Sequence, residues 1–221
     1  MAQPVFDPRL LPIDAIAGEA AVAPERLTPG WLRSRFASPP DWLPEGSEHE
    51  NGVVPRADAK AAAVLIALVA REHGLTLLLT QRTAHLTAHA GQISFPGGRS
   101  EPWDASPVDT ALRESHEEIG LERHHVDVLG TLPLYHTGTG YSVTPVVGLL
   151  TPPFDLRADP SEVEEIFEVP LAFLMNGLHH QRLSAALPDG RRSFYAMPYE
   201  RHYIWGATAG MLRNLFHFLR A

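Results

Sequence analysis

The sequence predicts an α/β fold of the α+β type, in which helices cover a mixed β-sheet. Three observations support this prediction. Apolar runs typical of strands come first, a sharply delimited helix follows them, and further strands precede an amphipathic helix near the C-terminus. The 221 residues are 44% hydrophobic and 20% charged, which is typical of one folded domain and argues against disorder.

Residues 1–58 differ in composition from the rest of the chain. They contain nine prolines and show weak apolar periodicity. One helix is predicted over 28–36, with Thr28 as its cap and Pro29 in its first turn. We interpret 1–58 as a proline-rich extension that packs on a domain formed by 59–221. A partly disordered arm is an equally good interpretation of the composition.

From residue 59 onward the pattern predicts most of the remaining elements in order. Two apolar runs predict a strand hairpin over 62–69 and 75–80. The segment 81–105 is rich in Gly, Pro, Ser and Thr, which predicts a long and therefore functional loop. The elements predicted after this loop are a helix at 107–119, strands at 126–132, 141–150 and 167–171, a short helix near Leu174, a hairpin of 193–195 with 202–205, and a helix at 207–219.

Composition excludes several classes of function. The chain has no cysteine, so disulfides, thiolate nucleophiles and cysteine metal sites are excluded. Eighteen basic against 26 acidic residues leave a net charge of −8, the wrong sign for non-specific nucleic-acid binding. No apolar run is long enough for a membrane span, and no secretory signal is visible. We expect a cytoplasmic protein. The histidine pairs His124–His125 and His179–His180 are expected at the surface or near the substrate rather than in a structural metal site.

The boundaries of the helix at 107–119 are marked by its flanking residues. Ser106 lies at the cap position, Pro107 at the first helical position, and Asp109 three residues after the cap. Gly120 is suited to the left-handed conformation that ends a helix. The face expected to be buried consists of Val108, Ala111, Leu112, Ser115 and Ile119.

A second face of this helix carries three carboxylates, those of Glu114, Glu117 and Glu118. At a separation of about 6 Å, each pair of like charges costs about 0.7 kcal/mol in water and nearer 3 at a protein-like dielectric. A solvated acidic face is the usual explanation for such a pattern. Here the cluster follows a glycine-rich loop on a capped helix, so we predict a site for a hard divalent cation, Mg²⁺ or Mn²⁺.

The loop and the helix together carry a recurrent pattern of Gly98, Arg113-Glu114, Glu117-Glu118 and Gly120-Leu121. This pattern resembles the Nudix box, written G-x5-E-x7-R-E-U-x-E-E-x-G-U with U a bulky apolar residue. The sequence departs from the box at Asp104, which stands in place of Glu and one residue further from the Arg, and at Ser115, which replaces an apolar residue. The resemblance implies a Nudix-like α/β/α sandwich with a catalytic loop–helix–loop.

A second pattern lies directly upstream and resembles the coenzyme A pyrophosphatase branch of the same family. The branch signature is L-L-T-x-R-[SA]-x3-R-x3-G-x3-F-P-G-G. Its matches are Leu78-Leu79-Thr80, Arg82, Gly91 and Phe95-Pro96-Gly97-Gly98, while Thr83 and Thr87 replace the Ser or Ala and the second Arg. The resemblance covers about residues 60–219.

The resemblance implies a set of site residues. The predicted ligands of Mg²⁺ or Mn²⁺ are Glu114, Glu117, Glu118 and Gly98. Glu117 and Arg113 are expected to be catalytic, with Arg113 orienting a glutamate through an ion pair. The predicted substrate contacts are Arg82, Gly97 and Phe95. Asp104 is expected to support the site from behind the ligands, and a residue that only caps the loop is the alternative. For Arg82 an exposed loop position, and for the two glycines a plain tight turn, are the alternatives.

The acidic run Glu162, Glu164 and Glu165 precedes the last predicted strand of the central region. In the wider family a glutamate from this region can serve as general base. We predict Glu165 for this role, and a solvated loop is the alternative for each of the three. A base needs suitable geometry and a suitable pKa, which a sequence does not show.

Three functions are compatible with these residues. The first is hydrolysis of the pyrophosphate bond of coenzyme A or acyl-CoA, giving 3′,5′-ADP and (acyl-)4′-phosphopantetheine. The second is a diphosphatase for ADP-ribose or a dinucleotide, which Thr87 would permit. The third is a non-catalytic binding module, which the intact glutamates argue against. The expected partner is a small nucleoside diphosphate, with no nucleic acid and no membrane, and a homodimer is compatible with the sequence.

Overall fold

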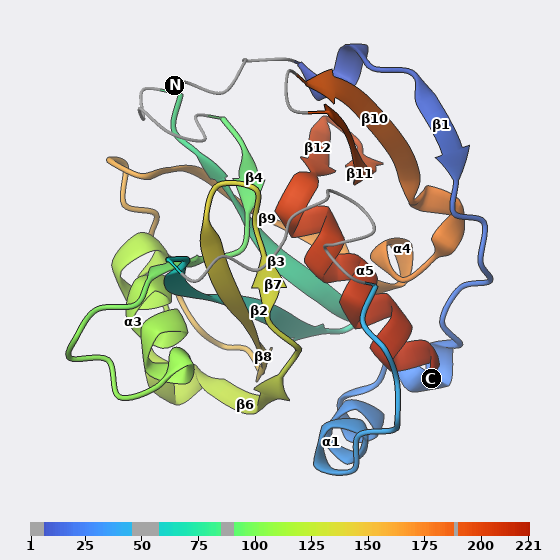
Figure 1. The fold of residues 1–221 in the computed structure, drawn as a ribbon. Coiled ribbons are helices and arrows are strands. Elements are labelled where there is room, and N and C mark those ends of the chain that lie inside the picture. Colours follow the sequence, from blue (N-terminus) through green and yellow to red (C-terminus); the bar gives the residue numbers. More distant parts are fainter. Residues whose placement is uncertain (1–6, 46–57, 85–90, 188–189) are drawn as a thin grey trace.

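The computed structural model describes residues 7–45, 58–84, 91–187 and 190–221. It has the mixed sheet and the covering helices that the sequence predicts (Figure 1). Strands β2 and β8 run parallel at the centre, and the other strand pairs of this sheet are antiparallel. The strand order is β4-β3-β2-β8-β6, with β9 paired to β3, β5 to β2 and β7 to β8.

Eight strands form this main sheet. Their bounds are β2 Lys60–Arg71, β3 Gly74–Arg82, β4 Ile93–Ser94, β5 Gly97–Arg99, β6 Val126–Thr131, β7 Tyr135–His136, β8 Tyr141–Leu150 and β9 Val163–Pro170. The predicted hairpin is β2 with β3, and the strand predicted over 141–150 is β8. Within the predicted long loop, the described residues add the short strands β4 and β5.

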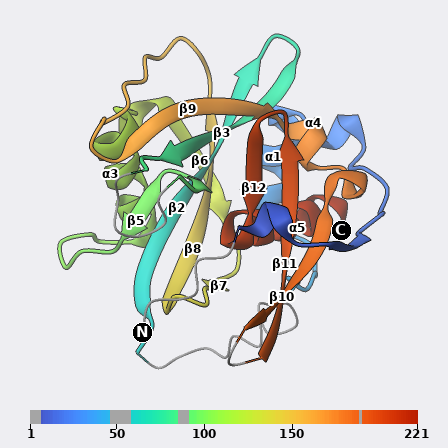
Figure 2. The ribbon, with the colours of Figure 1, turned by 90° about the horizontal axis from the view of Figure 1, so that it is seen from above.

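The two faces of the sheet support different helices. Along β2, Leu65 and Val69 point into one apolar cluster and Ile66 and Leu68 into the other, as the two-residue period of a strand requires. Helix α3 (Pro107–Ile119) covers the first face and helix α5 (Gly206–Arg220) the second (Figures 1 and 2). This arrangement is the α/β/α sandwich that the resemblance implies.

A second sheet of four strands lies on the α5 side of the molecule (Figure 1). Its order is β1-β10-β11-β12, and its strands are β1 Ile13–Ile16, β10 Gln181–Leu187, β11 Gly190–Tyr199 and β12 His202–Trp205. The predicted hairpin corresponds to β11 and β12. The sequence pattern does not predict β1 and β10, which pair with each other although more than 160 residues separate them.

The described part of the extension, residues 7–45, contacts the rest of the chain at several points. Helix α1 (Pro29–Ala37) is capped by Thr28, whose hydroxyl accepts a hydrogen bond from the Trp31 amide, and Leu32 is fully buried. The other helices of the described residues are the short α4 Leu171–Leu174 and the single 3-10 turns Pro8–Leu10, Pro24–Arg26, Arg123–His125 and Gly177–His179. The domain boundary at residue 58 stays a prediction.

A buried ion cluster joins the extension to α5. Arg213 is 2% exposed, and its guanidinium donates to the carboxylates of Glu19 (2.8 and 3.1 Å) and Glu45 (2.9 Å). His180, expected at the surface, is fully buried and contacts the same guanidinium at 3.0 Å through Nδ1. A buried guanidinium needs such partners because removing one leaves an uncompensated charge.

No helix among the described residues is long and apolar enough to cross a membrane.

Candidate active site

Helix α3 begins and ends where its flanking residues predict. The Ser106 hydroxyl accepts a hydrogen bond from the Asp109 amide at 3.2 Å, and Pro107 is the first helical residue. Gly120 ends the helix in the left-handed conformation, with φ of 67°. Of the predicted buried face, Val108 is only partly buried, and the other four residues are buried.

The three glutamates of α3 differ in environment. The Glu118 side chain is 4% exposed, that of Glu114 is 18% exposed, and that of Glu117 is 56% exposed. This gradient follows from the helix, because Glu118 lies nearest the buried face and Glu117 furthest from it. The cost of burying a carboxylate is therefore concentrated on Glu118.

Gly97 and Gly98 bring the backbone of β5 against this acidic face. The Gly97 amide donates to a Glu118 carboxylate oxygen at 3.0 Å, and the φ of Gly97 is +151°. A Cβ on Gly97 would lie under 3.0 Å from the Ala63 carbonyl oxygen, and one on Gly98 equally close to the Glu114 carboxylate. Both positions thus need the absence of a side chain for a close approach.

Arg113 connects the glutamates to the loop before the helix. Its Nη1 donates to Glu114 at 2.8 Å and to Glu117 at 3.0 Å, while Nε and Nη2 donate to Asp104 at 3.0 and 2.9 Å. Asp104 also accepts from the Thr110 hydroxyl, and its hydrogen bonds with Arg113 hold its pKa well below the usual range. Asp104 thus holds Arg113 from the loop before α3, and its supporting role in the site stays a prediction.

Arg82, at the end of β3, reaches the same acidic face from the sheet. Its Nη1 lies 3.4 Å from a Glu118 oxygen, and its Nη2 lies 3.7 Å from a Glu162 oxygen. The Arg82 guanidinium therefore bridges Glu118 and Glu162. Of the acidic run before β9, it is thus Glu162 rather than Glu165 that faces the α3 glutamates.

Glu165 lies on the other face of the sheet. It shares that face of β9 with Phe167 and Val169, and its carboxylate pairs with Arg201 and, at 3.2 Å, with His202. Burial would raise the pKa of Glu165, but the hydrogen bonds with His202 and Arg201 lower it. The structure thus does not bring Glu165 to the α3 glutamates. The apolar residues at i+2 and i+4 were a sequence signal for this orientation.

Phe95 is also placed away from the acidic face. Its side chain is 2% exposed and belongs to the apolar cluster on the α5 side of the sheet. The structure therefore gives the Phe95 side chain a packing role and does not bring it to the acidic face. Thr87, where the branch signature has an Arg, lies outside the described residues.

The electrostatics of the acidic face suit a cation. Burial raises the pKa of Glu118 to about 7, although the Gly97 amide and Arg82 oppose the shift, and burial also raises the pKa of Glu114. The charges of Glu162 and Glu114 add to the shift of Glu118. A divalent cation would offset this cost, and carboxylate and backbone oxygens are the donors that Mg²⁺ and Mn²⁺ prefer.

The carboxylates are not drawn together around a common point. Among the residues that the structure describes, no three His, Asp or Glu side chains lie close enough to hold a metal ion as they stand. Arg113 instead holds Glu114 and Glu117, and Gly97 and Arg82 contact Glu118. The donor set therefore fits the cation in chemistry, and binding requires some of these ion pairs to rearrange.

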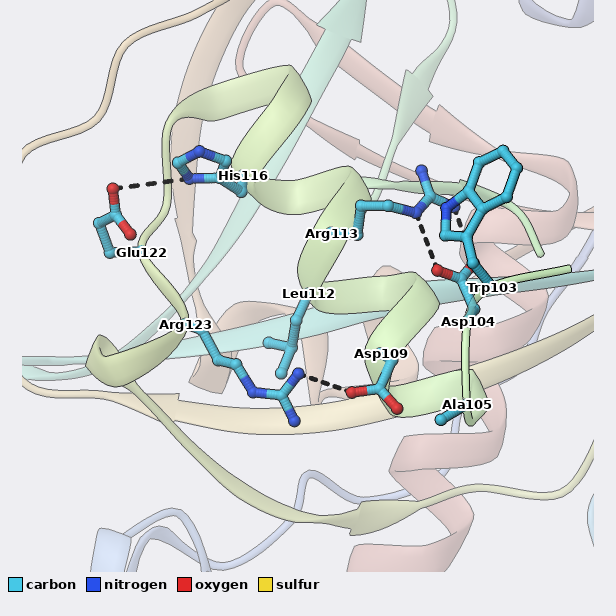
Figure 3. Close-up of a pocket in the computed structure, with 9 residues that line it drawn as sticks. All are labelled: Trp103, Asp104, Ala105, Asp109, Leu112, Arg113, His116, Glu122 and Arg123. Atoms are coloured by element: carbon cyan, nitrogen blue, oxygen red, sulfur yellow. Dashed lines mark hydrogen bonds and ion pairs between the residues drawn. The ribbon is translucent and has the colours of Figure 1, made fainter. Parts of the chain in front are cut away.

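A pocket of about 450 Å³ lies on the outer side of α3, next to the acidic face (Figure 3). Asp109, Leu112, Arg113 and His116 line it from the helix, and Trp103 lies at one end beside Arg113. Helix geometry turns these side chains away from Glu114 and Glu118. Arg113 lies between the pocket and the glutamates, since it lines the pocket and also pairs with Glu114 and Glu117.

The chain is similar to known proteins of one family. Residues 59–188 match the model of the NUDIX domain. The chain is 44% identical over 157 residues to the protein of Escherichia coli K12 named Uncharacterized Nudix hydrolase NudL, a match that covers 71% of this chain and 81% of that protein. Among solved structures, a MutT/nudix family protein from Enterococcus faecalis aligns over 85% of this chain and 73% of its own, with 16% identity and a TM-score of 0.47. The Ap4A hydrolase of C. elegans aligns over 50% and 80%, with 21% identity and a TM-score of 0.44.

Proposed function

Because the chain belongs to the Nudix family of hydrolases, we propose that it hydrolyses the pyrophosphate bond of coenzyme A or acyl-CoA. The products are 3′,5′-ADP and (acyl-)4′-phosphopantetheine. The observation that carries this proposal is the position of Arg82. This arginine of the upstream signature lies beside Glu118 of the Nudix box, so the two sequence patterns meet at one acidic face.

Nudix hydrolases generally use divalent metal ions. In this chain Glu114, Glu117, Glu118 and the backbone of Gly98 would hold Mg²⁺ or Mn²⁺. When bound, the ion neutralises the diphosphate and lowers the pKa of a water molecule. Arg113 orients Glu114 and Glu117 through its two ion pairs, and Asp104 fixes Arg113 from behind.

Arg82 is proposed to contact a phosphate oxygen, because a guanidinium donates in a fork that matches phosphate geometry. It is 23% exposed, so it can exchange a carboxylate partner for a phosphate without large movement. Glu162 is proposed as the general base in place of Glu165. Its half-exposed carboxylate lies next to Arg82 on the acidic face, where a water molecule attacking the diphosphate would lose its proton.

The test is a rate measurement with Mg²⁺ on coenzyme A, acetyl-CoA, ADP-ribose and a dinucleotide, with products identified by mass spectrometry. Release of 3′,5′-ADP from coenzyme A supports the proposal. Hydrolysis of ADP-ribose or a dinucleotide without hydrolysis of coenzyme A would favour the second candidate, which Thr87 in place of the signature Arg allows. A protein that hydrolyses none of these compounds would be a binding module.

The proposal for the base has its own test. Glu162→Gln is expected to lower kcat strongly and to leave the fold intact, because its side chain is 49% exposed. Glu164→Gln, a neighbouring exposed carboxylate, is the matched control and should retain activity. Equal losses in the two variants would contradict the assignment.

A further inference from the structure

The segment before β9 is held against the C-terminal end of α3 by backbone hydrogen bonds. The Arg157 amide donates to the Ile119 carbonyl at 2.9 Å, and the Asp159 amide donates to the Glu118 carbonyl at 2.9 Å. The last carbonyls of a helix lack intrahelical partners, so they accept from other parts of the chain. These hydrogen bonds hold the backbone of Asp159 against that of Glu118, at the end of the acidic face.

Asp159 organises the turn that carries Glu162. Its carboxylate accepts from the Ser161 amide at 2.8 Å and from the Ser161 hydroxyl at 2.7 Å, and these two hydrogen bonds lower the pKa of Asp159. Its backbone carbonyl accepts from the amides of Glu162 at 3.0 Å and Val163 at 2.8 Å. Asp159 therefore fixes three successive residues of the turn.

The other side of the turn is fixed by the end of β3. The Thr83 amide donates to the Glu162 carbonyl at 3.0 Å, and the Thr83 hydroxyl contacts the Ser161 carbonyl at 3.4 Å. The Glu162 side chain itself is half exposed, with Arg82 3.7 Å from its carboxylate. Its direction is thus determined mainly by the backbone that Asp159 and Thr83 hold.

We propose that Asp159 is a positioning residue, which docks on α3 and holds the Glu162 carboxylate beside Arg82 and Glu118. This inference rests on the proposed function, in which Glu162 accepts the proton of the attacking water. The Asp159 carboxylate is hydrogen-bonded to Ser161 within its own turn, and we assign it no contact with substrate. Its contribution is geometric, and small displacements of a catalytic group are costly to rate.

A double-mutant cycle tests the proposal with coenzyme A as substrate. Asp159→Ala is expected to lower kcat about 10-fold and to change KM less than about twofold, because the base moves and substrate contacts stay. In the Glu162→Gln background the same change should cost nothing further. Asp159→Asn keeps an acceptor for both Ser161 donors and should restore most of the rate. Asp155→Ala, at an exposed position of the same segment, is the control and should behave as wild type.

A loss from Asp159→Ala that persists in the Glu162→Gln background would overturn the proposal. Amide hydrogen exchange supplies a readout that does not depend on turnover. Asp159→Ala should accelerate exchange at Ser161, Glu162 and Val163 and leave α3 unchanged, and Asp159→Asn should restore protection. Unchanged exchange in this turn would also overturn it. Failure of the proposed function would give a different result. The wild-type protein would not hydrolyse coenzyme A, but Asp159→Ala would still accelerate amide exchange in the turn.

Discussion

Replacing Glu118 by glutamine is expected to stabilise the metal-free protein at pH 8. The carboxylate of Glu118 is 4% exposed, and its pKa rises from 4.5 to about 7 on folding. A raised carboxylate pKa means that folding disfavours the charged form. The free energy of unfolding of the metal-free protein therefore falls as pH rises from about 4.5 to about 7, and levels off above that.

The magnitude follows from the same two pKa values. With a pKa of 4.5 in the unfolded chain and about 7 in the folded protein, ionisation of Glu118 destabilises the folded protein by about 3 kcal/mol at pH 8. At pH 5 the destabilisation is about 1 kcal/mol, because the unfolded chain gains little from ionising so close to its own pKa. Glutamine resembles the protonated acid in shape and keeps an acceptor for the Gly97 amide. The variant is thus expected to exceed wild type by about 3 kcal/mol at pH 8 and about 1 kcal/mol at pH 5.

The assay is urea unfolding followed by circular dichroism in the presence of EDTA at both pH values. Glu117→Gln is the control, since the Glu117 side chain is 56% exposed, and it should stay close to wild type at each pH. Added Mg²⁺ should stabilise wild type at pH 8 more than the Glu118 variant. A Glu118→Gln protein no more stable than wild type at pH 8 would refute the argument that burial strains this carboxylate.

Three further predictions concern the site and the extension. Glu117→Gln should nearly abolish hydrolysis of the substrate while leaving the thermal midpoint within a few degrees of wild type, as measured by steady-state rates and calorimetry; a variant that keeps most of its rate would contradict the metal-ligand role. Gly98→Ala should lower activity on the order of 10-fold or more and leave the circular dichroism spectrum unchanged, because the new Cβ displaces the Glu114 carboxylate. Deletion of residues 1–58 should destabilise the protein by about 3–5 kcal/mol in urea unfolding, because Arg213 loses two carboxylate partners, and Arg213→Met should recover part of that loss; a truncated protein as stable as the full chain would contradict this.

The features of the site that depend on local sequence were predictable. The limits of α3 are confirmed because Ser106, Pro107 and Gly120 act within one turn of the helix ends. The separation of an acidic from an apolar face also followed from helix geometry alone. The order of burial of Glu117 and Glu118 follows from the same geometry, but the hydrogen bond from the Gly97 amide to Glu118 does not, because it depends on β5 packing across the helix.

Features that depend on distant pairing were harder to predict. The partner of β1 lies more than 160 residues further along the chain, and the four-residue run Ile13–Ile16 gives no sign of it. Glu165 lies within β9, whereas Glu162 lies in the turn before it, and only the alternation of Glu165 with Phe167 and Val169 indicates in the sequence that the two carboxylates are on different faces of the sheet. The ion pairs of Glu165 with Arg201 and His202 come from a hairpin whose position a sequence does not reveal.

The ion cluster at Arg213 has a consequence for how this chain is made. Glu19 and Glu45 precede Arg213 by 194 and 168 residues, so both carboxylates leave the ribosome long before their guanidinium partner exists. Arg26 and Arg35 donate to the carbonyls of residues 218–220, which are also synthesised much later than the two arginines. The described segment 7–45 can therefore reach its final place only after residues 213–220 have been synthesised.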